Sequence, residues 1–219
     1  MTFLRNNSLG IVLFLATFLA VFGMFFSGWH VGQEEALRHG DTPPLLWDYA
    51  TSGDFLSALF ENWESEFLQM AMYVCLTAFL FQKGSSESKD PESDGDPVDE
   101  DPAGHENDPE APWPVRYGGI VRTLYSYSLG LVLGLLFLLS FVLHLVNSAS
   151  AANEEALRHQ QPVMTVGEHL VSAQFWFESL QNWQSEFLST LVLVILSIFL
   201  RFRGSPESKP VAASYGTTG

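Results

Sequence analysis

The sequence predicts an all-α membrane protein whose four transmembrane helices form two tandem parallel helical-hairpin repeats, with interfacial amphipathic helices in the outward loops. Three observations lead to this prediction: long uncharged apolar runs, a repeat at a fixed offset, and a one-sided distribution of Lys and Arg. A length of 219 residues would also suit one or two soluble domains. The apolar residues are grouped into blocks, however, and this favours a membrane protein.

Four apolar runs supply the predicted spans. Residues 9–26 and 129–143 carry no charged side chain, and such runs approach the ~20 residues that cross a ~30 Å hydrocarbon layer. Two shorter uncharged runs, 67–80 and 187–200, each follow a tryptophan. Beginning these helices at the tryptophan brings them into the usual range of ~17 to 25 residues. The predicted spans are therefore about 8–28, 63–81, 126–147 and 183–202.

The second half of the chain repeats the first at an offset of 120 positions, without a gap. Three polar motifs recur in this register: EEALRH at 34–39 and 154–159, ENWESEFL and QNWQSEFL at 61–68 and 181–188, GSSESK and GSPESK at 84–89 and 204–209. In all, 30 of the 82 positions from Ser8 to Lys89 are identical. A register this strict over loops as well as helices indicates tandem duplication. Because the first apolar run has a copy in mid-chain, it is predicted to be a retained helix and not a signal peptide.

The basic residues near the predicted spans indicate the orientation of the chain. With four spans, eight of the ten Lys and Arg residues fall on the side of the two termini, and only Arg38 and Arg158 fall on the other side. By the positive-inside rule, both termini are cytoplasmic, and the EEALRH and tryptophan segments face outward. Since each copy has two spans, both copies insert in the same orientation, related by a pseudo-two-fold axis along the membrane normal.

The predicted domains follow from these boundaries. Residues 1–83 form the first repeat, 84–114 an acidic linker, 115–204 the second repeat and 205–219 a cytoplasmic tail. The linker has eleven acidic residues and one basic residue, so it supplies −10 of the net charge of −15. Such a composition buries too little apolar surface to offset the entropy of ordering, and the cytoplasmic linker is predicted to be disordered. The same negative charge argues against a nucleic-acid partner.

Residues 53–67 are predicted to form an amphipathic helix that lies in the membrane interface before the second span begins. A helical wheel with 100° between residues places an apolar stripe on one face: Phe55, Leu56, Leu59, Phe60, Trp63 and Phe67. Ser57, Glu61, Glu64 and Ser65 fall on the opposite face, which is predicted to be solvated. Glu66 lies beside the apolar stripe, with Asn62 on the same edge. The second copy keeps this pair as Asn182 and Glu186.

Asn62, Glu66, Asn182 and Glu186 form the candidate polar site, which has two interpretations. In the structural one, each carboxylate favours the unpaired amides at the first turn of a helix, while Trp63 and Trp183 are interfacial anchors. In the functional one, the four side chains meet near the pseudo-two-fold axis. Ionisable groups at membrane depth are costly unless they have a partner or a function.

The EEALRH hexamers also have two interpretations, a solvated helix and a metal site. Glu34 with Arg38, and Glu35 with His39, are i,i+4 pairs typical of a solvated helix. Their carboxylates and imidazoles also form a set that suits one or two divalent metals: Glu35, His39, Glu66, Glu155, His159 and Glu186. The spacing departs from the Glu-x-x-His of di-iron bundles. No cofactor is therefore predicted.

The Trp-x-Ser-Glu-Phe-Leu and Gly-Ser-x-Glu-Ser-Lys segments resemble those of a family of bacterial four-helix integral membrane proteins that is catalogued only as a domain of unknown function. The resemblance covers nearly the whole chain outside the acidic linker. It implies a location in the bacterial cytoplasmic membrane, the inner or plasma membrane. It implies no activity, substrate or catalytic residue.

The sequence favours a non-enzymatic membrane protein that contacts membrane lipid and self-associates into a homo-oligomer. No phosphate-binding glycine loop, nucleophile elbow or zinc-protease motif is present in it, and no catalytic residue is predicted. Three functional hypotheses stay open: a small transporter or channel component with Glu66 and Glu186 as a cation or proton site, an envelope scaffold that binds lipid or a protein partner, and a metal-dependent membrane enzyme.

Overall fold

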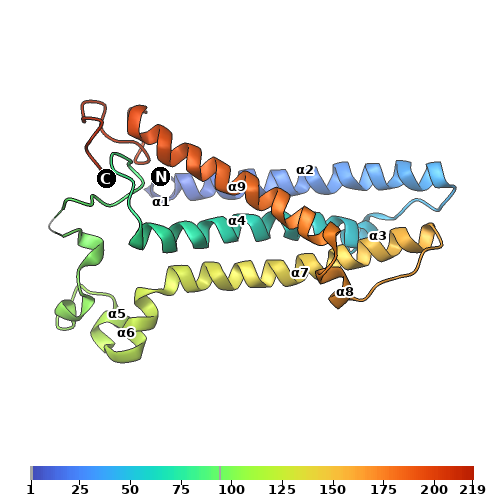
Figure 1. Ribbon diagram of the computed structural model, residues 1–219, viewed down its shortest axis with the longest axis horizontal. Coiled ribbons are helices and arrows are strands. Elements are labelled where there is room, and N and C mark those ends of the chain that lie inside the picture. The colour runs from blue at the N-terminus through green and yellow to red at the C-terminus, as the bar shows by residue number, and fades with distance from the viewer. Residues whose placement is uncertain (1, 94) are drawn as a thin grey trace. The chain divides into compact units, whose positions relative to one another are not determined.

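The computed structural model describes residues 2–93 and 95–219, and all regular elements in these ranges are helices, as the fold class predicts (Figure 1). In chain order they are α1 (Thr2–Asn6), α2 (Ser8–His39), α3 (Leu46–Ala50), α4 (Gly53–Phe79), the 3-10 helices η1 (Pro97–Asp99) and η2 (Pro102–His105), α5 (Trp113–Tyr117), α6 (Gly119–Ser126), α7 (Ser128–Arg158), α8 (Val166–Leu170) and α9 (Ala173–Phe199).

Three of these helices, α2, α7 and α9, are long and apolar enough to cross a membrane. Many of their large apolar side chains are exposed, among them Leu13, Leu135 and Leu191, as expected of surfaces that face lipid. Helix α4 is 27 residues long, as α9 is, but it is not one of the three. Its sequence has three acidic residues between Glu61 and Glu66, and Gln69 follows them.

The prediction of separate interfacial helices is wrong. Residues 53–67 are the first part of the unbroken helix α4, and the equivalent residues of the second copy are the first part of α9. Neither helix contains a Pro, or a Gly after Gly53, so the sequence offers nothing at which the chain would turn. Helices α2 and α7 likewise continue beyond the predicted spans, through both EEALRH segments.

The chain divides into two compact units. The first, named here the loop unit, consists of residues 1–62 and 140–177 and includes the segments around α3 and α8. The second, the linker unit, consists of residues 63–139 and 178–219 and includes the acidic linker. Helices α4, α7 and α9 each supply residues to both units.

In the loop unit, α4 and α9 begin with the same cap. The Ser52 hydroxyl accepts a hydrogen bond from the Phe55 amide (3.3 Å), and the Ser172 hydroxyl accepts one from the Phe175 amide (3.2 Å). Both phenylalanines are buried. Gly53 approaches α7 closely, since a Cβ atom there would lie 2.6 Å from the Ala151 nitrogen. The entrance to α4 is therefore built around a residue without a side chain.

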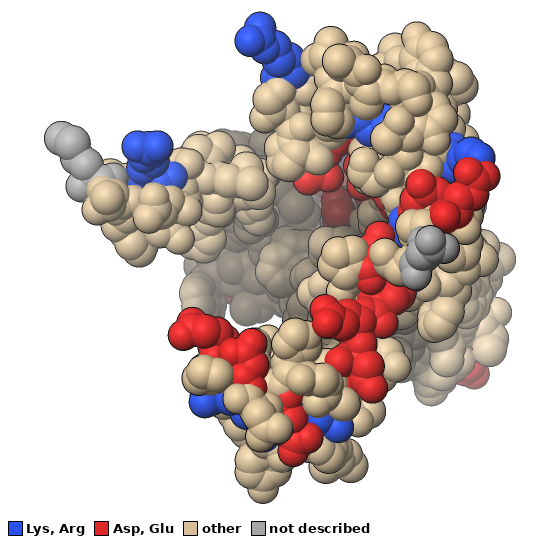
Figure 2. All heavy atoms as spheres, turned by 90° about the vertical axis from the view of Figure 1, so that its left-hand side faces the viewer, with Lys and Arg blue, Asp and Glu red and all other residues tan. Residues whose placement is uncertain are grey.

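In the linker unit, the described residues between Phe79 and Trp113 form only η1 and η2 as regular elements. Each begins at a proline and is capped by an aspartate: the Val98 amide donates to Asp96 Oδ1 (3.1 Å) and the Ala103 amide to Asp101 Oδ1 (2.9 Å). Figure 2 shows acidic side chains exposed on the face that carries the linker. The predicted disorder of the linker stays a prediction.

Candidate functional site

Polar side chains of α4 and α9 pair with one another in the linker unit. We name this set the polar seam and define it as Glu64, Glu66 and Gln69 of α4 with Trp183, Glu186 and Thr190 of α9. Two side-chain hydrogen bonds and one pair of carboxylates connect the two helices. The seam includes Glu66, Glu186 and Trp183, which the sequence singles out, and adds three residues that it does not.

The prediction that Glu64 faces solvent is wrong. Its side chain is fully buried, and its Oε1 accepts a hydrogen bond from Trp183 Nε1 at 2.8 Å. The Trp183 ring packs edge-on against Phe137 of α7, with 6.2 Å between the ring centroids. Ser65, assigned to the same solvated face, is also buried. This part of the polar face of α4 is therefore packed against the protein and not exposed to solvent.

Glu66 lies between Glu64 and Gln69, and Glu186 lies between Trp183 and Thr190, the residues whose two hydrogen bonds join α4 to α9. The two asparagines of the candidate site each bond back to their own helix. Asn182 Nδ2 donates to the Glu178 carbonyl at 3.3 Å, and in the loop unit Asn62 Nδ2 donates to the Ala58 carbonyl at 2.7 Å. The structure thus places both glutamates in the segments that these two hydrogen bonds join, whereas the four-residue site stays a prediction.

The third connection of the seam was missed at the sequence level. Gln69 Nε2 donates to Thr190 Oγ1 at 2.7 Å, and the Thr190 hydroxyl donates to the Glu186 carbonyl at 3.1 Å. Gln69 lies three residues after Glu66 and therefore on the same helix face. The signal by which the sequence could have identified Gln69 is an amide side chain within an otherwise apolar run.

Tyr73 continues the same face of α4 one turn beyond Gln69. Its hydroxyl donates to Glu87 Oε2 at 2.9 Å. Two cavities border this hydrogen bond, one of about 550 Å³ and one of about 320 Å³, and both are lined by Tyr73, Thr77, Glu87 and Ser88. The smaller cavity also reaches Thr190 of the polar seam.

The Gly-Ser-x-Glu-Ser-Lys motif builds the same turn twice, after α4 and after α9. Gly84 and Gly204 have φ values of 87° and 89°, the left-handed region that favours glycine. Four positions later, Ser88 accepts a hydrogen bond from the Gln82 amide and Ser208 accepts one from the Phe202 amide, at 2.9 Å in both cases. The repeated motif therefore ends both helices.

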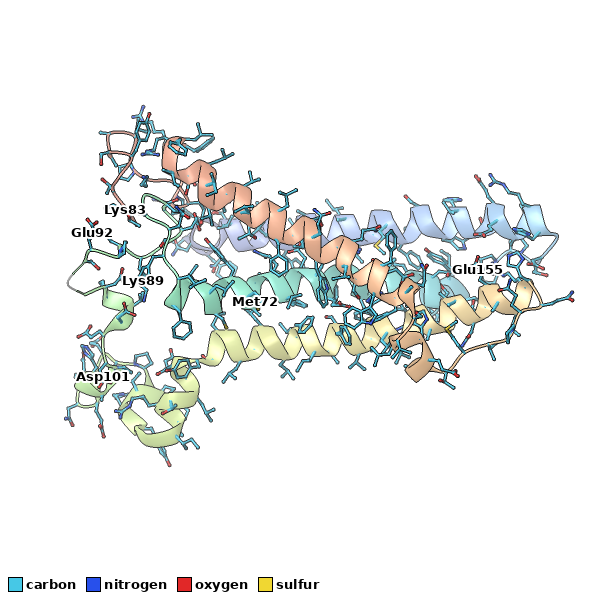
Figure 3. All side chains as sticks on the ribbon, viewed as in Figure 1. Met72, Lys83, Lys89, Glu92, Asp101 and Glu155 are labelled. Carbon is cyan, nitrogen blue, oxygen red and sulfur yellow. The ribbon has the colours of Figure 1, made fainter. Side chains whose placement is uncertain are left out.

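The lysines that close the two motifs have different partners. Lys89 Nζ donates to both carboxylate oxygens of Asp99 in the linker, at 2.7 and 2.9 Å. Figure 3 labels Lys89 together with Lys83 and Glu92, a second ion pair at this end of the linker. Lys209 is 2% exposed and donates to the carbonyls of Gly84, Tyr215 and Thr217. Burial lowers the pKa of Lys209, and the charge of Arg201 lowers it further.

In the loop unit, the EEALRH residues of the metal hypothesis are exposed: Glu35, His39, Glu155 and His159. Glu155 is labelled in Figure 3. Arg38 pairs with Glu34 at 3.4 Å, the spacing predicted for a solvated helix. Among the described residues, no three His, Cys, Asp or Glu side chains gather in a group that would hold a metal ion. The arrangement lends the metal hypothesis no support.

Asp54 lies in the first turn of α4, before the predicted span. Charged residues of both EEALRH segments act on its carboxyl group. Partial desolvation raises the pKa of its carboxyl, Arg158 opposes this, and Glu35 and Glu155 raise the pKa further. The structure therefore brings acidic side chains of both copies into reach of one carboxyl group.

A buried polar pair in the loop unit was also missed. Ser148 Oγ lies 2.8 Å from His169 Nε2, and both residues are buried. At the equivalent positions, 120 residues earlier, are Gly28 and Tyr49. A Cβ at Gly28 would lie 2.0 Å from the Tyr49 hydroxyl oxygen. Both copies thus pack a ring against a small residue, and only comparison of the two copies in register would have pointed to it.

A protein-family model matches residues 1–219, and its description is "Domain of unknown function (DUF6766)". The match extends over the whole chain, including the acidic linker. No curated protein and no solved structure matches the chain.

Proposed function

Because the chain belongs to the DUF6766 family, whose description states no activity, we propose from the geometry of its site that it is a four-span membrane protein that moves protons or small cations along its polar seam. Glu66 and Glu186 are the ion-binding groups in this proposal. It deepens the first of the three functional hypotheses with the contacts around these carboxylates.

Helix α4 provides the fourth span in this proposal, from residue 63 onward. It has the length of α9 and ends in the same hydrogen-bonded turn. What separates α4 from the apolar helices is the polar side chains of the seam, and these are paired with α9. Polar groups that are satisfied by a neighbouring helix can reside in a bilayer. The pairing therefore supports a membrane location for α4 in spite of its lower hydropathy.

The tandem arrangement of two hairpins is part of the same proposal. Features of equal geometry recur 120 residues apart: the caps at Ser52 and Ser172, and the turns at Gly84 and Gly204. They support a duplication in which both copies have the same orientation. The Lys and Arg distribution supports the further part of the proposal, that both termini lie on the cytoplasmic side of a bacterial plasma membrane.

The observation that carries the proposal is the position of Glu66 and Glu186 between the two hydrogen bonds that join α4 to α9. Two carboxylates that act on each other at membrane depth either share a proton or attract a cation, because two adjacent negative charges are costly there. The adjoining amide and hydroxyl are groups that can exchange hydrogen bonds with a hydrated ion or with water.

The test uses the purified full-length chain in liposomes, with proton flux and alkali-cation flux recorded separately. Replacing both carboxylates (Glu66→Gln with Glu186→Gln) should lower the flux roughly tenfold or more. Glu61→Gln is the matched control, since position 181 of the second copy already has Gln, and it should keep the flux. Equal flux in the wild type and the double variant would contradict the proposal.

A further inference from the structure

We propose that Glu87, held by Tyr73, is the group through which the polar seam exchanges protons with water on the linker side, so that the proton is the ion that the seam carries. This inference rests on the proposed function of Glu66 and Glu186. It assigns a binding role to a residue of the first Gly-Ser-x-Glu-Ser-Lys turn, which otherwise serves only to end α4.

Two hydrogen bonds hold the Glu87 carboxylate, and a third holds its backbone amide. Oε2 accepts from the Tyr73 hydroxyl at 2.9 Å, Oε1 accepts from the Ser86 hydroxyl at 3.3 Å, and the Glu87 amide donates to Ser85 Oγ at 3.1 Å. A surface glutamate in a turn would not need such partners. The carboxylate is therefore held in one place against the end of α4.

The two cavities give this carboxylate a connection in each direction. The cavity of about 320 Å³ is bordered by Glu87 at one place and by Thr190 of the polar seam at another. The cavity of about 550 Å³ is bordered by Glu87 together with Lys89, Asp96 and Asp99 of the linker side. Since one water occupies ~30 Å³ of liquid volume, each cavity has room for several waters. The Glu87 side chain therefore borders both cavities.

The walls of the smaller cavity favour a proton over a metal cation. Besides Thr190, Glu87 and a few other polar side chains, its lining is apolar: Leu76, Leu80, Phe81, Leu191 and Val194. A metal cation that gives up its hydration shell needs several oxygen ligands at once. A proton needs only a series of groups that donate and accept hydrogen bonds.

One proton moves from the polar seam to water on the linker side. The protonated member of the Glu66–Glu186 pair gives its proton to a water beside Thr190, the seam residue that borders the smaller cavity. The hydronium formed passes the proton through water in that cavity to the Glu87 carboxylate. The Glu87 carboxyl then releases the proton to water in the larger cavity, which returns Glu87 to a carboxylate. Tyr73 keeps its own proton throughout and orients the Glu87 carboxylate, so it is a positioning residue.

The second copy supplies a matched control. Glu207 occupies the position equivalent to Glu87, and Leu193 occupies the position equivalent to Tyr73. The second carboxylate therefore has no tyrosine at the corresponding place to orient it. The proposal predicts that Glu87 is needed and Glu207 is not, although the charge of Glu207 also acts on Tyr73.

The experiment compares Glu87→Gln, Glu207→Gln and Tyr73→Phe in liposomes that carry the full chain. Glu87→Gln should lower proton flux roughly tenfold or more, and Tyr73→Phe should lower it by a smaller factor. Glu207→Gln should stay near the wild-type rate. A membrane-impermeant buffer such as MES, raised in concentration on both sides, should restore flux in Glu87→Gln, because buffer molecules in the larger cavity replace the missing carboxylate. A misfolded variant would not respond to buffer.

The outcomes separate the two proposals. If the double variant of Glu66 and Glu186 loses flux while Glu87→Gln keeps it, the role of Glu87 is refuted and the seam stands. If neither variant changes the flux, the proposed function fails as well. A seam that conducts sodium or potassium ions in place of protons would overturn the inference about the ion, and equal losses in Glu87→Gln and Glu207→Gln would overturn the assignment to one copy.

Discussion

Helices α4 and α9 have the same length, the same serine cap and the same terminal turn, yet their middle parts differ in chemistry. Glu64 of α4 is buried and bonded to Trp183, whereas the equivalent Gln184 is exposed. Tyr73 of α4 bonds to Glu87, whereas the equivalent residue of α9 is Leu193. The residues common to both copies thus build the ends of the helices and supply Glu66 and Glu186, whereas Glu64, Gln69 and Thr190 of the polar seam occupy positions at which the copies differ.

The largest expected effect tests the part in which the two helices differ. Trp183→Phe removes the N–H that donates to the buried Glu64 carboxylate and should lower the free energy of unfolding in detergent by about 2 kcal/mol. In a double-mutant cycle with Glu64→Leu, much of this loss should be recovered, because the buried carboxylate no longer needs a donor. Additive losses in the cycle would show that the hydrogen bond contributes nothing.

The next effect concerns the glycines of the terminal turns, which the copies share. Gly84→Ala and Gly204→Ala should each lower the free energy of unfolding by about 1–2 kcal/mol, because both residues have positive φ. Gly84→Ala should cost more, since its Cβ would lie 2.6 Å from the Tyr215 carbonyl oxygen, whereas a Cβ at Gly204 meets nothing within 4 Å. Chemical denaturation in detergent measures both, and a larger loss for Gly204→Ala would contradict the geometry.

The serine caps should behave alike in the two copies. Ser52→Ala and Ser172→Ala each remove the hydroxyl that accepts from the first turn of α4 or α9, and each should cost about 1 kcal/mol. The measurement is again the free energy of unfolding, with Ser52→Asp and Ser172→Asp as variants that keep a capping oxygen. If both alanine variants kept the stability of the wild type, the serine caps would stabilise neither helix.

The smallest effect concerns Asp54, whose counterpart in the second copy is the uncharged Gln174. Its pKa is raised in the folded chain, so the ionised form weakens the folded state relative to the unfolded one. Asp54→Asn should therefore raise the melting temperature at neutral pH. This gain should shrink as the pH falls through the raised pKa of the folded chain and vanish below the unfolded value of about 3.9. A gain that is independent of pH would contradict the assignment to ionisation.

The sequence predicted the all-helical class, because helix periodicity and apolar length are local properties. It did not predict the continuous helix α4, since a tryptophan followed by carboxylates is also what an interfacial helix shows. A helical wheel separates polar from apolar faces but does not say which face is outside. Glu64 on the polar face is buried, and it was therefore assigned to the wrong side.

The candidate polar site shows the same limit. The repeated Glu66 and Glu186 could be singled out from the sequence because they occupy equivalent positions of the two copies. Gln69, Thr190 and Tyr73 were missed because their role depends on partners far away in the sequence: the Gln69–Thr190 bond joins residues 121 positions apart. Pairings of this kind follow from packing, which one sequence does not specify.

The backbone carbonyls around Lys209 have a practical consequence for anyone who attaches a reporter to this chain. The amide of Gly219 itself donates to the Ser85 carbonyl at 3.1 Å, next to the residues that Lys209 holds. A fluorescent protein or affinity tag fused after Gly219 would pull on these contacts, whereas one fused ahead of α1, which has no buried residue, would leave them intact.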